Sequence, residues 1–236
     1  MKRKIITTED GSKTIQIEDW NEQYHSKHGA INEANHVFIK SGLLHFLNKI
    51  YPDNKCHLER SRNVSNKKIS ILEIGLGTGL NAFLTAIEAE RLKQPINYVG
   101  VEAYPVADTE VSQLNYVEEI DENRSDLFKK LHENKWETTN ALTSYFKLTK
   151  RQQFFSDIKD ISQFDLIYFD AFGARVQPEL WTKDIFKIMY NALKPKGVLV
   201  TYAAIGEVKR AMKALGFTVE RLEGPPGKRH MLRATK

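Results

Sequence analysis

Short apolar runs alternate with stretches of helical periodicity over most of the chain. Continuous apolar runs with β-branched or aromatic residues are typical of buried strands, and they cover residues 69–74, 96–102, 164–170 and 198–202. Apolar residues at helical spacing, with caps or a first-turn proline at some ends, predict helices over residues 82–91, 105–115, 125–133, 182–193 and 206–215. Strands that alternate with helices in this way form a doubly wound, Rossmann-like α/β sheet.

Both ends of the chain show the pattern of an antiparallel hairpin. Residues 4–7 and 14–17 flank a turn that contains Asp10-Gly11, a favourable hairpin dipeptide. Residues 217–222 and 230–234 flank a loop rich in glycine and proline. The second hairpin is expected to close the parallel sheet with antiparallel strands.

A polar and aromatic loop at residues 20–29 precedes a predicted helix over residues 30–50. These segments come before the first strand of the alternating pattern. We therefore expect residues 1–68 to form a small N-terminal extension of hairpin, loop and helix, packed on an α/β core at residues 69–236.

The first strand of the core runs into a glycine turn, Gly75-x-Gly77-x-Gly79, followed by a helix. This arrangement begins nucleotide-binding units, because glycines let a ligand approach the main chain and the helix offers free N–H groups. A dinucleotide fingerprint requires Gly-x-Gly-x-x-Gly, and here Leu80 stands where the third glycine belongs. A phosphate-binding P-loop requires a lysine after the glycines, and none is present.

The remaining interpretation is S-adenosylmethionine (SAM), because Glu73-x-Gly-x-Gly-Thr-Gly79 resembles the first motif of class I SAM-dependent methyltransferases. The resemblance implies that Glu73 holds the amino acid end of the cofactor and that Glu102, after the next strand, holds the ribose hydroxyls. A carboxylate suits two vicinal hydroxyl donors. Asp157 matches the place of an acid that faces the adenine amino group in this family. The candidate cofactor residues of the core are Glu73, Gly75, Gly77, Thr78, Gly79, Asn81, Glu102, Asp157 and Asp170.

Asp170 and Phe172 follow the strand that normally ends beside the transferred methyl group. An amine must be neutral to attack a methyl group, and it gains positive charge as the bond forms. A carboxylate at this place can accept the proton and stabilise that charge. We therefore expect Asp170 to act in catalysis and Phe172 to wall the pocket or to stack on a base.

Several segments together resemble the MnmC methyltransferase family. They are Tyr24-His-Ser with Glu33-Ala-Asn-His-Val-Phe38, the stretch from Glu73 to Asn81, Asp170-Ala-Phe with Pro178-Glu-Leu-Trp181, and Gly224-Pro-Pro-Gly-Lys-Arg-His-Met-Leu-Arg233. The family methylates the primary amine of 5-aminomethyluridine, or its 2-thio form, at wobble position 34 of tRNA, and this gives 5-methylaminomethyluridine. The resemblance implies that the loop with Tyr24 and Ser26 lies over the cofactor. It also implies a stand-alone form of the methyltransferase domain, linked functionally to a separate enzyme that makes the aminomethyl group.

The C-terminal third of the chain is basic, with ten lysines and arginines from Lys194 onward against three glutamates. Such an imbalance favours an anionic partner such as nucleic acid. Lys228, Arg229 and Arg233 are the candidates for contact with tRNA, and the prolines before them stiffen the loop. In the family this loop carries an aromatic residue, which is missing here. An anticodon loop can present a splayed-out base to a pocket.

The composition fits a cytoplasmic protein. The chain has 236 residues, a net charge of +5 and one cysteine, Cys56, so that no intramolecular disulfide can form. The N-terminus has no apolar signal region and no run approaches transmembrane length. We expect neither a metal ion nor a membrane partner.

Two alternatives remain open. An aminopropyltransferase similar to spermidine synthase shares Asp170-Ala-Phe and the following helix, although its product is cationic and needs no basic loop. A noncatalytic RNA-binding protein on the same fold is the second alternative, and the retention of Glu73, Glu102 and Asp170 argues against it.

Overall fold

A computed structural model describes residues 2–52 and 67–236 of the chain; Cys56 lies outside these ranges. Eight strands of the described residues form one mixed sheet in the order β10-β11-β9-β8-β4-β5-β7-β6. They are β4 (Ile69–Ile74), β5 (Ile96–Val101), β6 (Thr139–Ala141), β7 (Phe146–Arg151), β8 (Phe164–Phe169), β9 (Leu193–Thr201), β10 (Thr218–Glu223) and β11 (His230–Thr235). The five central strands β7, β5, β4, β8 and β9 are parallel, and the two edges are antiparallel. This is the class I methyltransferase fold with its C-terminal hairpin, as predicted.

Helices cover both faces of the sheet because its central strands are apolar on both sides. One face packs against η1 (Asn35–Leu44), α4 (Leu80–Leu92) and α7 (Ser125–Glu133), and the other against α8 (Lys183–Ala192) and α9 (Gly206–Ala214). Successive strand residues alternate between the two layers: Ile71 belongs to the first and Leu72 to the second. The remaining helical segments are α1 (Ala30–Ala34), α2 (His45–Ile50), α5 (Asp108–Val111), α6 (Tyr116–Ile120), η2 (Glu122–Arg124), η3 (Phe155–Asp157) and η4 (Pro178–Trp181).

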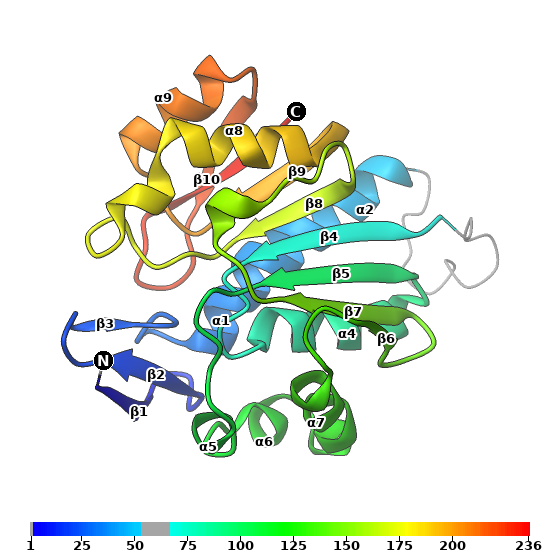
Figure 1. The fold of residues 1–236 in the computed structure, drawn as a ribbon, viewed down its shortest axis with the longest axis vertical. Helices are drawn as coiled ribbons and strands as arrows, with labels where there is room; N and C mark the ends of the chain where they lie inside the picture. The colour runs from blue at the N-terminus through cyan, green and yellow to red at the C-terminus, as the bar shows by residue number, and fades with distance from the viewer. Residues whose placement is uncertain (1, 53–66) are drawn as a thin grey trace.

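The N-terminal hairpin is present as β1 (Arg3–Thr7) and β2 (Lys13–Ile17). A two-residue strand, β3 (Glu22–Gln23), adds to them within the predicted loop, which makes a small antiparallel sheet. Figure 1 shows this sheet beyond the carboxyl ends of the central strands. The predicted helix over residues 30–50 is also found, but its middle half is the π-helix η1.

Two expectations after β5 and β7 were wrong. Pro105 does not begin a helix: α5 starts at Asp108, and Ala107 before it is extended. The reason is local, because the segment after β5 is held by the Glu102 carboxylate, which accepts from the Tyr104 N–H at 2.9 Å. The sequence also predicts an extended segment at residues 153–156, but no strand forms there, and the chain makes the short helix η3 instead. No helix in the described ranges is long and apolar enough to cross a membrane.

Candidate active site

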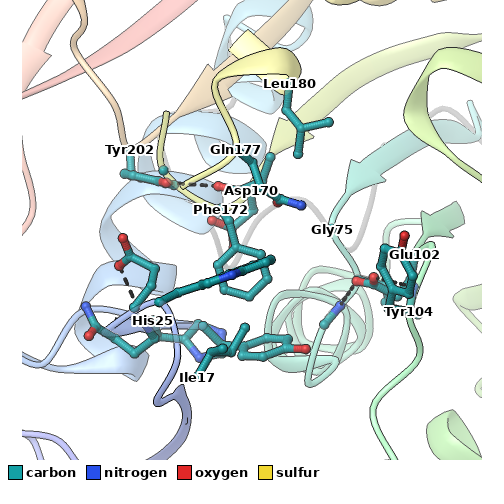
Figure 2. A pocket seen from close by; sticks show the side chains of 18 of the residues that line it. Ile17, His25, Gly75, Glu102, Tyr104, Asp170, Phe172, Gln177, Leu180 and Tyr202 are labelled. Atoms are coloured by element: carbon teal, nitrogen blue, oxygen red, sulfur yellow. Dashed lines mark hydrogen bonds between the residues drawn. The ribbon is translucent and has the colours of Figure 1, made fainter. Parts of the chain in front are cut away.

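A cavity of about 1470 Å³ opens at the carboxyl edge of the central strands. The glycine turn after β4, the end of β5 and the loop after β8 form its inner wall, and the N-terminal loop and residues 227–228 form its outer wall. Figure 2 shows Asp170 and Phe172 between Tyr202 on one side and Gly75 on the other, with Glu102 beyond the turn. The strand order reverses here, since β4 lies between β5 and β8, and open α/β sheets bind ligands at this switch point.

The glycine turn comes close to two neighbouring segments. Gly75 has φ +87°, and a Cβ atom there would lie 2.5 Å from the Asp170 carbonyl oxygen. Gly77 has φ +50°, and a Cβ atom there would lie 3.0 Å from the Tyr24 ring. Both positions therefore require glycine for conformation and for space. Gly79, with φ +76°, precedes α4.

Thr78 lies within the glycine turn and Asn81 lies in the first turn of α4, and their side chains point in different directions. The Thr78 hydroxyl is buried and lies 3.1 Å from the Tyr116 hydroxyl, outside the cavity lining. Asn81 lines the cavity, and its side-chain amide donates to Glu73 Oε1 at 2.9 Å and to Asp170 Oδ2 at 2.8 Å. One amide therefore links the strand that carries the first acid to the strand that carries the second.

Glu73 is fully buried, and its Oε2 atom has no hydrogen-bond partner. Burial raises the pKa of Glu73 well above its usual value, and the hydrogen bond from Asn81 opposes the rise. A buried carboxylate oxygen without a donor is an uncompensated acceptor. Glu73 does not line the cavity, and the neighbouring Tyr98 hydroxyl also lowers its pKa, so this acceptor faces the protein interior.

Asp170 is also perturbed. Burial raises the pKa of its carboxyl to about 7, and the negative charge of Glu33 adds to the rise. The hydrogen bond from Asn81 and the positive charge of Lys228 act in the other direction. A carboxyl with a pKa near 7 can take up or release a proton at neutral pH.

Glu102 faces the same turn from β5. Its carboxylate accepts from the Gly77 N–H at 3.1 Å and from the Tyr104 N–H at 2.9 Å. Burial raises the pKa of Glu102. The side chain is thus fixed by main-chain donors at the place where the resemblance expects ribose hydroxyls.

Aromatic rings form one wall of the cavity. Phe172 packs edge-on against Tyr24, with ring centres 4.8 Å apart, and against Trp20 at 5.8 Å. Ser26, from the same N-terminal loop as Tyr24, lines the cavity and is buried, and its hydroxyl accepts from the His28 N–H at 3.2 Å. The loop predicted to lie over the cofactor does border the cavity.

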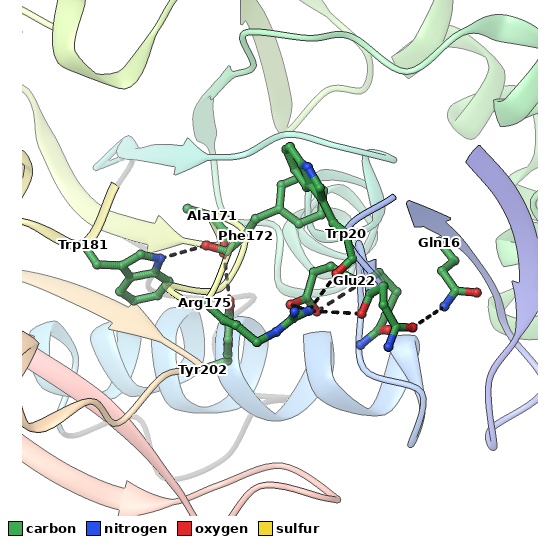
Figure 3. A network of polar contacts seen from close by, with 10 residues as sticks. Gln16, Trp20, Glu22, Ala171, Phe172, Arg175, Trp181 and Tyr202 are labelled. Carbon is green, nitrogen blue, oxygen red and sulfur yellow. Dashed lines mark hydrogen bonds and ion pairs between the residues drawn. The ribbon is translucent and has the colours of Figure 1, made fainter. Parts of the chain in front are cut away.

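The loop after β8 is tied down on three sides (Figure 3). Trp181 Nε1–H donates to the Phe172 carbonyl at 2.7 Å, and the Tyr202 hydroxyl donates to the Ala171 carbonyl at 2.9 Å. Arg175 donates to the carbonyls of Trp20 and Asn21 and pairs with Glu22 at 3.0 Å. These bonds hold Asp170 and Phe172 in place and join them to the N-terminal sheet.

The other predicted residues lie apart from one another. Asp157 is exposed and does not line the cavity, although its neighbour Ser156 does. Arg229 is exposed at the base of the β10–β11 loop, where its carbonyl accepts from the Gly224 N–H at 3.2 Å. Arg233 lies on β11 and forms a two-bond pair with Glu220 at 2.9 and 3.1 Å. Lys228 points into the cavity, where it pairs with Glu33.

Glu33 and Tyr202 are cavity residues that sequence reasoning missed and that bear polar groups. Glu33 is only 6% exposed and accepts from the Ser26 N–H at 2.9 Å. The available signal was an acid on the apolar face of a predicted helix, between Ala30 and Ala34. Tyr202 follows directly after β9, and only the parallel pairing of β8 with β9 shows that it lies beside Ala171.

Comparison with known proteins supports this description. A family model described as S-adenosyl-L-methionine-dependent methyltransferase matches residues 118–236. The chain is 25% identical to the tRNA 5-methylaminomethyl-2-thiouridine biosynthesis bifunctional protein MnmC of Hydrogenovibrio crunogenus, with 98% of the chain and 33% of that protein covered. It is 27% identical to the MnmC of Leptospira borgpetersenii, with 89% and 31% covered. The chain thus spans about a third of the length of these curated relatives.

Solved structures agree on the fold. MnmC2 from Aquifex aeolicus superimposes with a TM-score of 0.73 at 22% identity, covering 99% of the chain and 69% of that structure. Spermidine synthase from Thermotoga maritima reaches a TM-score of 0.50 at 12% identity, covering 99% and 72%. On the family match and the shared fold, the chain belongs to the family of S-adenosyl-L-methionine-dependent methyltransferases that includes the methyltransferase domain of MnmC.

Proposed function

We propose that the protein methylates the primary amine of 5-aminomethyluridine, or its 2-thio form, at position 34 of tRNA. The observation that supports this most directly is Asp170, a carboxyl with a pKa of about 7 that lines the cavity beside an aromatic wall. The names of the MnmC relatives point to the same tRNA modification. The chain spans only about a third of the length of these relatives, so the proposal concerns the methylation step alone.

SAM fits the residues around the glycine turn. Glu102 offers an acceptor for the ribose hydroxyls of the cofactor, and Glu73, which lies outside the cavity lining, would act on its amino acid end through Asn81. Gly75 and Gly77 leave the main chain open to a ligand, with Tyr24 against the turn. We propose that Ser26 lies over the bound cofactor, and that Asp157 acts only if η3 turns toward the cavity. SAM supplies an electrophilic methyl group on sulfonium sulfur.

The chain's own task is to deliver a neutral amine. Asp170 in its ionised form accepts a proton from the substrate ammonium group, which frees the nitrogen lone pair. Once that proton has passed to solvent, the ionised carboxylate stabilises the positive charge that develops on nitrogen as the new bond forms. Phe172 and Tyr24 give the uracil ring an apolar wall that excludes water. Arg229 is exposed next to Lys228 in the basic loop, and we propose that it contacts tRNA phosphates.

The direct test is incubation with labelled SAM and tRNA that carries 5-aminomethyluridine, followed by nucleoside analysis. We expect labelled 5-methylaminomethyluridine. If the protein binds SAM and tRNA but forms no such product, the proposed function is wrong. Transfer from decarboxylated SAM to a polyamine would favour an aminopropyltransferase, an alternative for which the likeness to spermidine synthase shows the fold alone. Binding of tRNA without any binding of SAM would favour a noncatalytic RNA-binding protein.

A further inference from the structure

The ammonium group of Lys228 occupies a small cage in the cavity wall. Its Nζ atom is paired with Glu33 Oε1 and lies 3.8 Å from the centre of the Tyr202 ring. A carboxylate and an aromatic face together make a receptor for a primary ammonium group. The cage is therefore of the kind that binds R–CH₂–NH₃⁺, and in this structure the bound group belongs to the protein itself.

The walls of the cage do not depend on Lys228. Glu33 Oε2 is held by the Ser26 N–H at 2.9 Å, and the Glu33 side chain is only 7% exposed. The Tyr202 hydroxyl is held by the Ala171 carbonyl at 2.9 Å. Since these bonds go to the main chain of other segments, removal of the lysine leaves the receptor in place.

The side chain of Lys228, in contrast, can leave the cage. Lys228 lies in the loop between β10 and β11, and its side chain is 31% exposed. Its own main chain is fixed within the loop, because the Lys228 N–H donates to the Pro225 carbonyl at 2.9 Å. Rotation about the side-chain bonds therefore moves the ammonium group into solvent while the loop keeps its shape.

The cage lies next to the reacting carboxylate. Tyr202 is bonded to Ala171, the neighbour of Asp170, and the charges of Glu33 and Lys228 both act on the Asp170 carboxyl. With Lys228 withdrawn, two carboxyl groups face one part of the cavity. Such a pair favours the binding of a cation or a proton.

We propose that Glu33 and Tyr202 form the receptor for the ammonium group of the substrate, and that Lys228 fills this receptor until the substrate displaces it. The inference rests on the proposed function, because it takes the substrate to be a primary amine. Displacement exchanges one ammonium group for another, so the cavity keeps its charge when the substrate enters.

Binding of a free nucleoside separates this inference from any contact of the loop with tRNA. The probe is 5-aminomethyluridine, and 5-hydroxymethyluridine serves as the uncharged analogue of similar size. Lys228→Met removes the competing ammonium group, so we expect it to tighten binding of the aminomethyl nucleoside about tenfold, whereas Glu33→Gln weakens it by about as much. Neither change affects the hydroxymethyl analogue. Glu133→Gln, which alters the exposed Lys129–Glu133 pair outside the cavity lining, is the matched control.

A second measurement follows the lysine in the unaltered protein. In a protein with ¹³C-labelled lysine, the Lys228 Cε resonance, assigned by its loss in Lys228→Met, should move toward the position of exposed lysines when the aminomethyl nucleoside is added. An unmoved resonance, or an equal or weaker affinity in a folded Lys228→Met variant, would overturn the inference. If the protein methylates tRNA but Lys228 is not displaced, the receptor inference is wrong and the proposed function stands. If Lys228 is displaced but tRNA is not methylated, the proposed function is wrong and the receptor inference stands.

Discussion

Asn81 joins Glu73 to Asp170: one side-chain amide donates 2.9 Å to the first carboxylate and 2.8 Å to the second. Glu73 is the penultimate residue of β4 and Asp170 follows β8. The amide therefore connects the proposed cofactor side of the cavity to the proposed reacting side. The hydrogen bond lowers the pKa of Asp170 against the larger effect of burial. Replacement of Asn81 is therefore expected to affect both sides at once.

Asn81→Leu should shift the pH dependence of methylation. The variant loses the hydrogen bond that favours ionised Asp170, so the pKa of that carboxyl rises further above 7. The acidic limb of the kcat profile, which reports ionisation of the base, then moves to higher pH. The measurement is kcat from pH 5.5 to 9 with saturating substrates. A profile that superimposes on that of the unaltered protein contradicts the link.

Asp170→Asn should abolish most turnover while SAM affinity changes little. The amide cannot take a proton from the amine, and general-base groups typically contribute about 10²- to 10⁴-fold. Single-turnover rates and calorimetric binding of SAM separate the two effects. Equal activity in the variant would remove Asp170 from the mechanism.

The same variant should become more stable than the parent at high pH. The pKa of Asp170 is raised from 3.8 to about 7 in the folded protein, so the folded state binds more protons than the unfolded state between these values. Stability therefore falls as pH rises from about 4 to 7, by an upper bound of about 4 kcal/mol. Asp170→Asn removes this loss. We expect its Tm to exceed that of the parent at pH 8 and to approach it at pH 4, and the reverse order would contradict the raised pKa.

Glu102→Gln should weaken SAM binding by about tenfold, because a charged acceptor for two hydroxyl donors becomes a neutral one. The fold should persist, since the glutamine oxygen can still accept from the Gly77 or Tyr104 N–H. Glu118→Gln, an exposed change outside the cavity lining, is the control. Calorimetric titration with SAM provides the measurement, and matching affinities in the two variants would assign Glu102 a structural role only.

Arg229→Ala should weaken tRNA binding and reduce the salt dependence of its affinity. Each lost phosphate contact lowers the slope of log K against log salt by about 1. Arg91→Ala, at an exposed site near the end of α4, is the matched loss of one arginine and should leave the slope unchanged. If the slope for Arg229→Ala equals that of the parent, Arg229 does not contact the RNA backbone.

The sequence predicts the parallel core well because buried strands and glycine turns are local signals. Glu73, Glu102 and Asp170 each end a predicted strand, and parallel strands bring such ends to one edge. Lys228 shows where this reasoning stops. A basic loop predicts contact with solvent or phosphate, and only the packing of the hairpin against the N-terminal loop turns Lys228 toward Glu33. The pairing of residues 195 positions apart has no local signature.

The prediction of a helix start at Pro105 was wrong for a related reason. A proline followed by helix-forming residues favours a helix start. Here the Glu102 carboxylate accepts from the Gly77 and Tyr104 N–H groups, and the segment after β5 therefore stays non-helical. Hydrogen bonds to one buried carboxylate thus override a local propensity.

The N-terminal loop and the β10–β11 loop meet at the mouth of the cavity. Gly227 packs so closely on the His28 ring that a Cβ atom there would collide with it, and Lys228 reaches Glu33 beside that contact. During synthesis the ribosome must therefore add residue 228 before the outer wall can close. A nascent chain that has folded only its parallel core still lacks this wall, so capture of substrate must wait until the β10–β11 hairpin has been made.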